Sequence, residues 1–294
     1  MRRASRTAVI PVLLFGAMST SERLVFSLGG GWRETSAVSS VGRGARCTCN
    51  CAARLDIALH SLCERAWRAE AVTIGVKICG IRKRADLDAA VDAGASHCGL
   101  VFFPPSPRSL SLDAAAELAR HGRGRVAMVA LTVDADDALI AAIAAQVMPD
   151  MIQLHGKESP ERAAHIREIT GLPVIKAVSV ADARDVEAAA AYRGVADLIL
   201  FDAKPPRRQA GALPGGNGLR FDWRLLGALK GRMDFALSGG LTPENVADAI
   251  AVTQPVLVDV SSGVETAPGQ KDAALIRQFV EAARAPILEG AAYG

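Results

Sequence analysis

The sequence predicts a single (β/α)8 barrel over residues 72–294, preceded by an N-terminal extension over residues 1–71. From residue 72 onward, eight short apolar runs alternate with eight Ala-rich amphipathic segments. Each run is apolar almost throughout, as expected of a parallel strand that is covered on both faces. Eight such units in about 220 residues match the number of strands that closes a TIM barrel with a filled interior.

An open, doubly wound sheet is the alternative fold for alternating strands and helices. Such a sheet usually has fewer strands, and it would carry a glycine fingerprint directly after its first strand. The segment VKICGIRKR at residues 76–84 has no such fingerprint. The barrel is therefore the predicted fold.

The elements follow one another along the chain in strict alternation. The predicted strands cover residues 72–78, 97–103, 125–131, 151–154, 173–180, 196–201, 234–238 and 255–260. The predicted helices cover residues 85–95, 112–122, 135–147, 160–171, 183–194, 221–231, 243–252 and 271–285.

Helix ends are recognisable at several of these boundaries. Ser159-Pro160-Glu161 and Thr242-Pro243-Glu244 each place an N-cap residue, a proline at the first helical position and an acid in the first turn. Five glycines close predicted helices in the manner of C-terminal capping glycines: Gly94, Gly122, Gly171, Gly194 and Gly231. These signals support helices that start and stop between the strands.

The extension over residues 1–71 has no sustained period and is rich in Arg, Ser, Gly and Ala. We expect it to be disordered, or to lie upstream of the true start as part of an over-long gene. Its first residues, MRRASRTAVIPVLLFGAMS, imitate a signal peptide, a reading that we rank below those two. The run is far shorter than the 18 or more apolar residues of a membrane span.

The charge pattern argues against nucleic acid as a partner. The whole chain carries a formal charge of +3, and residues 1–70 hold ten Arg, no Lys and five acids, a balance of +5 that leaves −2 for the rest. The barrel is thus an ordinary, mildly acidic domain. We expect a small-molecule substrate, no membrane partner, and either a monomer or a homodimer.

The cysteines indicate a reducing cytoplasm and no metal site. Only Cys79 and Cys98 lie in the predicted barrel, too few for a disulfide framework. Cys47, Cys49 and Cys51 lie in the extension with Cys63. Their C-x-C-x-C spacing differs from that of structural zinc sites, and no His pair follows.

Polar residues and glycines gather at the carboxyl ends of the predicted strands, where barrel enzymes hold their active sites. In chain order these ends are Cys79-Gly80, 104–108, 132–134, His155-Gly156, Ser179, Asp202, 238–240 and 261–263. The last two, with sequences SGG and SSG, include Gly239, Gly240, Ser261, Ser262 and Gly263. Two consecutive glycine-rich loops with adjacent serines favour a phosphate site built from backbone N–H groups, although tight turns alone also use glycine.

Several motifs at these ends resemble those of one enzyme family, the phosphoribosylanthranilate isomerases of tryptophan biosynthesis. The resemblance runs from about residue 73 to residue 285 and touches every predicted unit. It rests on VKICGI, FFPPSPRSLS, QLHG, FDAK, GGNGLRFDW, LSGGLTPENV and VDVSSGVE-x-x-PGQKD, in this order. It implies a barrel of the ribulose-phosphate-binding type and a cofactor-free Amadori rearrangement of N-(5′-phosphoribosyl)anthranilate.

The resemblance also implies roles for Cys79 and Asp202. On spacing alone, Cys79 reads as a small buried hydrophobe and Asp202 as a helix cap or a partner of Lys204. The family's acid and base map onto them, one motif position each. Asp202 would protonate the ring oxygen of the sugar, and Cys79 as a thiolate would remove the proton from C2′. Lys77 is one cation that could tune this thiol.

Further residues are candidates for binding. Arg108 in the SPRS motif would clamp the anthranilate carboxylate, because a guanidinium binds a planar carboxylate with two hydrogen bonds. Asp259 precedes the last loop and would hold its amides or serve the structure alone. Gly216 lies in the glycine-rich sixth loop, where Asn217 departs from the small residue that we expect. His155 and Gln153 read as wall residues without a chemical step.

Two other functions stay open at this point. A different phosphosugar enzyme could use the same phosphate-binding barrel, but the related enzymes of tryptophan and histidine synthesis rely on a lysine or on two aspartates, so Cys79 argues against them. A catalytically idle barrel that serves as a binding module is the other alternative. Keeping both Cys79 and Asp202 argues against that reading.

Overall fold

The computed structural model of this chain describes residues 25–27, 32–34, 74–204, 215 and 218–285. The chain divides into two compact units, Met1–Trp67 and Arg68–Gly294. In the first unit, the short strands β1 (Val25–Ser27) and β2 (Trp32–Glu34) pair antiparallel. The prediction for residues 1–71 falls mainly on residues outside the described ones, as do Cys47, Cys49, Cys51 and Cys63, and it stays a prediction.

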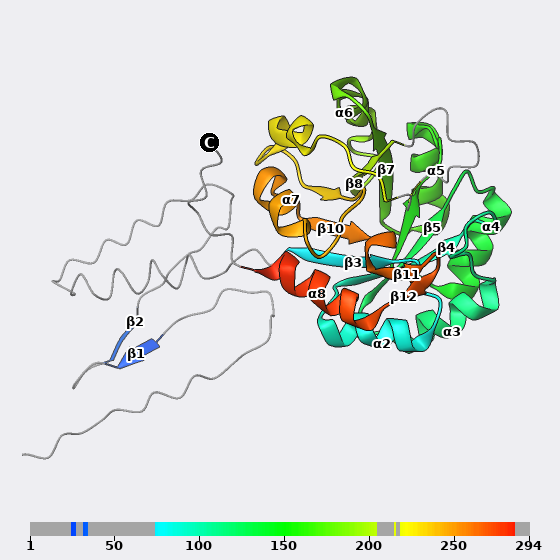
Figure 1. The fold of residues 1–294 in the computed structure, drawn as a ribbon, viewed down its shortest axis with the longest axis horizontal. Coiled ribbons are helices and arrows are strands. Elements are labelled where there is room, and N and C mark those ends of the chain that lie inside the picture. Colours follow the sequence, from blue (N-terminus) through cyan, green and yellow to red (C-terminus); the bar gives the residue numbers. More distant parts are fainter. Residues whose placement is uncertain (1–24, 28–31, 35–73, 205–214, 216–217, 286–294) are drawn as a thin grey trace, which may run out of the picture. The chain divides into compact units, whose positions relative to one another are not determined.

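The second unit is a closed parallel barrel with helices around it (Figure 1), as the sequence predicts. Around the barrel the order is β10, β3, β4, β5, β6, β7, β8 and β9, and parallel pairing of β10 with β3 closes the ring. The strands are β3 (Gly75–Cys79), β4 (His97–Phe102), β5 (Ala127–Thr132), β6 (Met151–Leu154), β7 (Val174–Val180), β8 (Leu198–Ala203), β9 (Phe235–Leu237) and β10 (Leu257–Val260).

An α-helix follows each barrel strand except β8, which is followed by a 3₁₀ helix. The α-helices are α2 (Arg84–Ala93), α3 (Leu112–Gly122), α4 (Asp137–Ala142), α5 (Pro160–Thr170), α6 (Ala183–Ala188), α7 (Val246–Thr253) and α8 (Ala273–Arg284). A small hairpin of β11 (Glu265–Ala267) and β12 (Gln270–Lys271) precedes α8. None of the helices in the described part of the chain combines the length and the apolarity needed to cross a membrane.

Four predicted helices differ in detail from the structure. The one over 183–194 is α-helical only to Ala188 and continues as a 3₁₀ helix, Ala189–Tyr192. The segment predicted over 221–231 forms a 3₁₀ helix, Trp223–Leu229, and the one over 135–147 changes from α4 into a π-helical turn, Ile143–Val147. Helix α7 begins only at Val246, because Thr242, Pro243 and Glu244 form a turn in which the Asn245 side chain accepts a hydrogen bond from the Thr242 backbone. The Ser159 cap is confirmed, as are left-handed glycines at 94, 171, 194 and 231. Gly122 is instead the last residue of α3 and has no left-handed φ.

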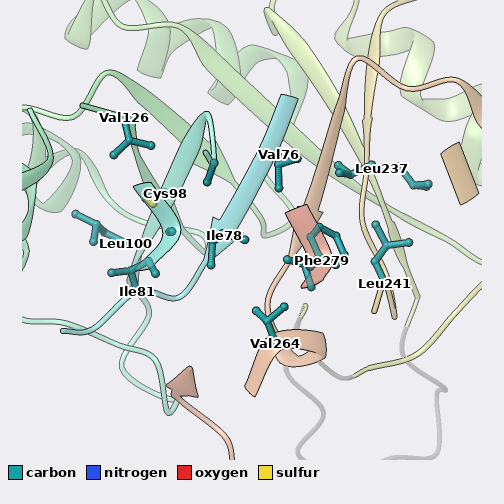
Figure 2. Close-up of a cluster of buried hydrophobic side chains, with 14 of the residues drawn as sticks. Val76, Ile78, Ile81, Cys98, Leu100, Val126, Leu237, Leu241, Val264 and Phe279 are labelled. Carbon is teal, nitrogen blue, oxygen red and sulfur yellow. The ribbon is translucent and has the colours of Figure 1, made fainter. Parts of the chain in front are cut away.

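Two layers of apolar side chains hold the barrel together. The larger layer fills the space between strands and helices; Figure 2 shows Val76 and Ile78 of β3, Cys98 and Leu100 of β4 and Phe279 of α8 within it. The smaller layer fills the barrel interior with Val129, Ile175, Ala177, Leu200, Ala236 and Leu257. Burial of this apolar surface is the main force that stabilises the fold.

Candidate active site

Strand alternation decides which side chains enter the barrel. Successive side chains of a strand point to opposite faces. Because Val76 and Ile78 pack toward the helices (Figure 2), Lys77 and Cys79 face the barrel interior. The register then places Asp259 of β10 beside Lys77, and Gly99 of β4 beside Cys79.

One cavity opens at the carboxyl ends of the strands, with a volume of about 760 Å³ counted to its open mouth. Nearly every site residue predicted from the sequence lines it: Cys79, Arg108, Asp202, Gly239, Gly240, Asp259, Ser261, Ser262 and Gly263. Gly216 lies outside the described residues. Its neighbours Gly215 and Gly218 line the cavity.

Cys79 is the last residue of β3 and is only 4% exposed. Burial raises the pKa of its thiol, while the charges of Lys77 and Lys271 act in the opposite direction. Ser261 Oγ donates to the Cys79 carbonyl oxygen (3.2 Å) and so ties the end of β3 to the loop after β10. Cys79 is therefore a buried thiol at the floor of the cavity.

Asp202 lies on β8 and is also almost fully buried. Its Oδ1 accepts from the Ala203 backbone N–H (2.9 Å), and its Oδ2 lies 3.1 Å from His155 Nε2. Gln153 Nε2 lies 2.9 Å from His155 Nδ1. The sequence reading of His155 and Gln153 as wall residues without a chemical step missed this contact, since the two residues form a polar chain that ends on the Asp202 carboxyl.

Arg108 is buried and is held by the protein's own carboxylate. Its Nε and Nη2 donate to the two oxygens of Glu265 at 2.8 and 2.7 Å. Lys271 Nζ donates to the same carboxylate (2.7 Å) and to the Ser261 carbonyl oxygen (2.9 Å). Although burial alone would raise the pKa of Glu265, its hydrogen bond with Arg108 and the charge of Lys271 hold that pKa below its usual value.

The glycine-rich loops after β9 and β10 lie against each other. Gly239 and Gly240 have left-handed φ angles of 91° and 63°, which glycine adopts without strain. A Cβ on Gly263 would stand 1.9 Å from the Leu241 carbonyl oxygen, so only glycine permits this approach. The loops thus expose backbone on the cavity wall, as anion-binding loops do.

Asp259 was predicted either to hold loop amides or to serve the structure alone. Its oxygens accept from Lys77 Nζ (2.7 Å) and Ser238 Oγ (3.4 Å). Lys77 and Asp259 are 0% and 4% exposed. The carboxylate is thus paired with a buried cation directly below the cavity.

Glu265 and Lys271 were not singled out from the sequence as site residues. Both lie in motifs that carry the family resemblance, VDVSSGVE and PGQKD, so their presence was visible there. Their roles depend on Arg108, which is 157 residues from Glu265 in the chain. Only closure of the barrel brings these groups together.

The arrangement defines a class of protein: a (β/α)8-barrel enzyme whose cavity combines a thiol, a carboxyl group, a guanidinium and two loops suited to a phosphate. Among the described residues, no group of three or more His, Cys, Asp or Glu side chains could hold a metal ion.

Comparison with known proteins narrows this class to one family. The family model for N-(5′-phosphoribosyl)anthranilate (PRA) isomerase matches residues 76–282. The isomerase of Brucella canis is 51% identical over 211 residues, which cover 72% of this chain and 94% of that protein. The chain belongs to the N-(5′-phosphoribosyl)anthranilate isomerase family.

Solved structures of the family have the same fold. The phosphoribosyl anthranilate isomerase of Thermotoga maritima is 39% identical with a TM-score of 0.65, over 71% of this chain and 98% of that one. A second structure, 38% identical with a TM-score of 0.62 and the same coverage, is in complex with reduced 1-(o-carboxyphenylamino)-1-deoxyribulose 5-phosphate. Its ligand combines a carboxylate, an aromatic ring and a phosphate.

Proposed function

We propose that Cys79 and Asp202 carry the family's reaction in this chain, the isomerisation of N-(5′-phosphoribosyl)anthranilate to 1-(2-carboxyphenylamino)-1-deoxyribulose 5-phosphate. The observation that supports this assignment is their position. Cys79 ends β3 and Asp202 lies near the end of β8, and both line one cavity with Arg108 and the two glycine-rich loops. A base and an acid can therefore reach one sugar from different sides.

The substrate's two charged ends fix its orientation in this proposal. The phosphate binds the backbone of Gly239, Gly240, Ser262 and Gly263, and the anthranilate carboxylate binds Arg108. The aromatic ring lies against an apolar wall of the cavity that includes Val101, Phe103, Leu131 and Val133. This orientation places the ribose between Cys79 and Asp202.

In the first step, Asp202 as a carboxylic acid gives its proton to the ring oxygen of the ribose. The bond between C1′ and this oxygen breaks, and the lone pair of the anthranilate nitrogen forms a protonated Schiff base. His155, 3.1 Å from Asp202 Oδ2, positions the acid. Asp202 ends the step as a carboxylate.

Gln153 contacts one nitrogen of His155, and Asp202 contacts the other. The orientation of the Gln153 amide therefore depends on whether Asp202 is protonated. With its NH₂ group on His155 Nδ1, the imidazole carries its proton on Nε2 and donates it to a carboxylate. In this orientation Gln153 Oε1 has no hydrogen-bond partner among the described residues. Turning the amide over lets Oε1 accept from Nδ1–H, so that Nε2 accepts from a protonated Asp202.

In the second step, Cys79 as a thiolate removes the proton from C2′. The electrons of the C–H bond form a C1′–C2′ double bond and neutralise the Schiff base nitrogen, giving an enolamine. The enolamine then tautomerises to the ketone as C1′ gains a proton. No external oxidant or reductant is needed, because the aldose carbon is reduced while C2′ is oxidised.

The setting of the enzyme follows from the same assignment. The substrate is a phosphoribosyl small molecule, and we propose that the chain acts as a monomer or a homodimer in the cytoplasm. Cys79 and Cys98 support a reducing compartment, since both are free thiols. That the reaction needs no cofactor or metal, and that nucleic acid is no partner, stay predictions.

Turnover of freshly made substrate by the purified chain tests this function. Conversion removes the fluorescence of the anthranilate group, so fluorescence should decay at a rate proportional to enzyme. Fluorescence that stays constant with folded protein would contradict the proposal and favour an idle binding module. Turnover of another phosphosugar in its place would favour a different enzyme on this barrel.

A further inference from the structure

Lys77 is a buried cation that the proposed mechanism does not use. Its side chain is fully buried on the inward face of β3, two residues before Cys79. Its Nζ donates to Asp259 Oδ1 at 2.7 Å. Burial alone would lower the pKa of Lys77, but the Asp259 carboxylate keeps that pKa above its usual value, so the group stays an ammonium ion.

Burying such a pair is costly, and an apolar side chain of the same size would fill the space at no such cost. The two residues sit opposite each other on adjacent strands, β3 and β10. The pair lies directly beneath the cavity, with Asp259 among its lining residues. A role in the cavity above would explain why this costly ion pair is buried there.

Gly99 leaves open a space that the ammonium ion of Lys77 and the thiol of Cys79 both border. A Cβ on this residue of β4 would stand 2.9 Å from Cys79 Sγ and 3.1 Å from Lys77 Nζ. The two polar groups therefore flank one point in the barrel interior. A side chain on β4 at this place would press on both groups, so the missing Cβ leaves the space between them open.

The charges around Cys79 favour its thiolate form. The thiol faces Lys77 of β3, Asp259 of β10 and Lys271 of β12, and beyond Lys271 lie Glu265 and Arg108. These buried groups comprise three cations and two carboxylates. A thiolate at Cys79 would offset the one surplus positive charge of this buried group, whereas a neutral thiol would leave it unbalanced.

Strand β4 contributes no further charge near the thiol. Burial and the charge of Lys77 lower the pKa of His97, which keeps this imidazole neutral at pH 7. Burial raises the pKa of Cys98 to about 12, which keeps this second thiol protonated. The cation that opposes the effect of burial on Cys79 most strongly is therefore Lys77.

We propose that Lys77 is a positioning residue for the general base: its buried ammonium ion, anchored by Asp259 and given room by Gly99, stabilises Cys79 as a thiolate. Lys77 touches no substrate and acts through the thiol. The inference rests on the proposed function of Cys79, but it concerns the ionisation of that side chain and can be measured without turnover.

The test is the pH dependence of Cys79 alkylation by iodoacetamide in the full chain, with each cysteine resolved by mass spectrometry. Only the thiolate reacts. Lys77→Met should move the midpoint upward by about 1–3 pH units, the effect of losing an opposite charge at this range. At pH 7, kcat/KM should fall about 10-fold or more, and Lys77→Arg should restore most of both values.

Two further variants keep Lys77 and test the same inference even if the Lys77→Met protein does not fold. Asp259→Asn removes the anion that competes for the ammonium ion and should move the Cys79 midpoint downward. Gly99→Ala adds one methyl group between Sγ and Nζ and should move it upward. Gly227→Ala is the matched control, because a Cβ there meets nothing within 4 Å.

The outcomes separate this inference from the proposed function. Unchanged midpoints in folded Lys77→Met and Gly99→Ala proteins would overturn the role of Lys77, whatever their activity. If Cys79→Ala retains turnover, the catalytic role of Cys79 fails, while the alkylation midpoints still report on Lys77. Shifted midpoints with the predicted signs support the inference in either case.

Discussion

The thiol of Cys79 and the carboxyl group of Asp202 lie at the ends of strands separated in the barrel by β9 and β10. The proposed mechanism needs both, in opposite protonation states. Replacing either one removes a proton transfer and leaves the other in place. Their variants therefore test the assignment residue by residue.

Cys79→Ala and Asp202→Asn should each lower kcat by at least about 10²-fold, the usual scale for a general acid or base. Asp202→Asn is nearly isosteric and Cys79→Ala removes a single sulfur atom, so the far-UV circular dichroism spectrum of each variant should match that of the parent chain. Steady-state fluorescence kinetics check the prediction. A variant that turns over substrate at nearly the parent rate would remove its residue from the mechanism.

Arg108→Ala should lower kcat/KM by about 10- to 100-fold, mainly through KM, because a charge-assisted hydrogen bond to the substrate carboxylate is lost. Arg84→Ala is the control, since the Arg84 side chain is 64% exposed and pairs with Glu117 only at 3.8 Å. Unchanged kinetics in Arg108→Ala would mean that Arg108 serves Glu265 alone.

The sequence predicted those site residues that lie in recognisable motifs. It did not predict the contacts that form only when the barrel closes. Cys79, Arg108 and Asp202 stand out in VKICGI, SPRS and FDAK. The pairing of Lys77 with Asp259, 182 residues apart, exists because β10 closes the barrel on β3. The contact of His155 with Asp202 likewise requires β6 and β8 to curve toward one axis.

The hairpin of β11 and β12 supplies the carboxylate that holds Arg108 in place and a second cation that shares this carboxylate. Glu265 of β11 accepts from Arg108, and Lys271 of β12 donates to the same carboxylate. All three side chains are almost fully buried. The hairpin therefore contributes to a buried network of ion pairs beside the cavity.

Glu265→Gln should destabilise the fold at pH 7 by on the order of 3 kcal/mol, because two buried cations lose their anion. The pKa of Glu265 is lowered from 4.5, so its contribution is complete above that value and is lost as pH falls through its lower, folded value. The free energies of unfolding of parent and variant, measured in urea, should thus differ strongly at pH 7 and less at about pH 3. An equal gap at both values would contradict the ion pairing.

The loops after β9 and β10 make a separate prediction. Inorganic phosphate should compete weakly with substrate, because exposed backbone N–H groups bind the anion. Gly263→Ala should raise KM and weaken this competition, since its Cβ would stand 1.9 Å from the Leu241 carbonyl oxygen. Competition kinetics measure both effects, and phosphate inhibition that Gly263→Ala leaves intact would place the phosphate elsewhere.

Periodicity predicted every barrel strand but not every helix type. An apolar run marks a buried strand, yet hydrogen bonding to both neighbours decides where it ends, so β3 begins at Gly75 and not at residue 72. The segment 221–231 is amphipathic, but its described part winds as a 3₁₀ helix. Sequence alone cannot distinguish these, because a short amphipathic segment suits either winding and its packing decides.

At the level of the whole molecule, the barrel is complete without the extension. All eight strands and the helices that cover them lie between Gly75 and Arg284, and closure runs from β10 to β3. The match to the isomerase family model begins at residue 76. Every strand of the closed barrel that the structure describes lies after residue 74.

A chain that starts at Ala71 should therefore fold and turn over substrate at the full-length rate. Residues 1–70 lack a sustained apolar period, and ordering each of them would cost roughly 1–2 kcal/mol of backbone entropy. Limited proteolysis should trim the full chain to about the same point, with activity preserved. A truncated chain that is insoluble or inactive would show that the barrel depends on the extension. Export with cleavage near residues 17–20 would instead identify the first residues as a signal peptide.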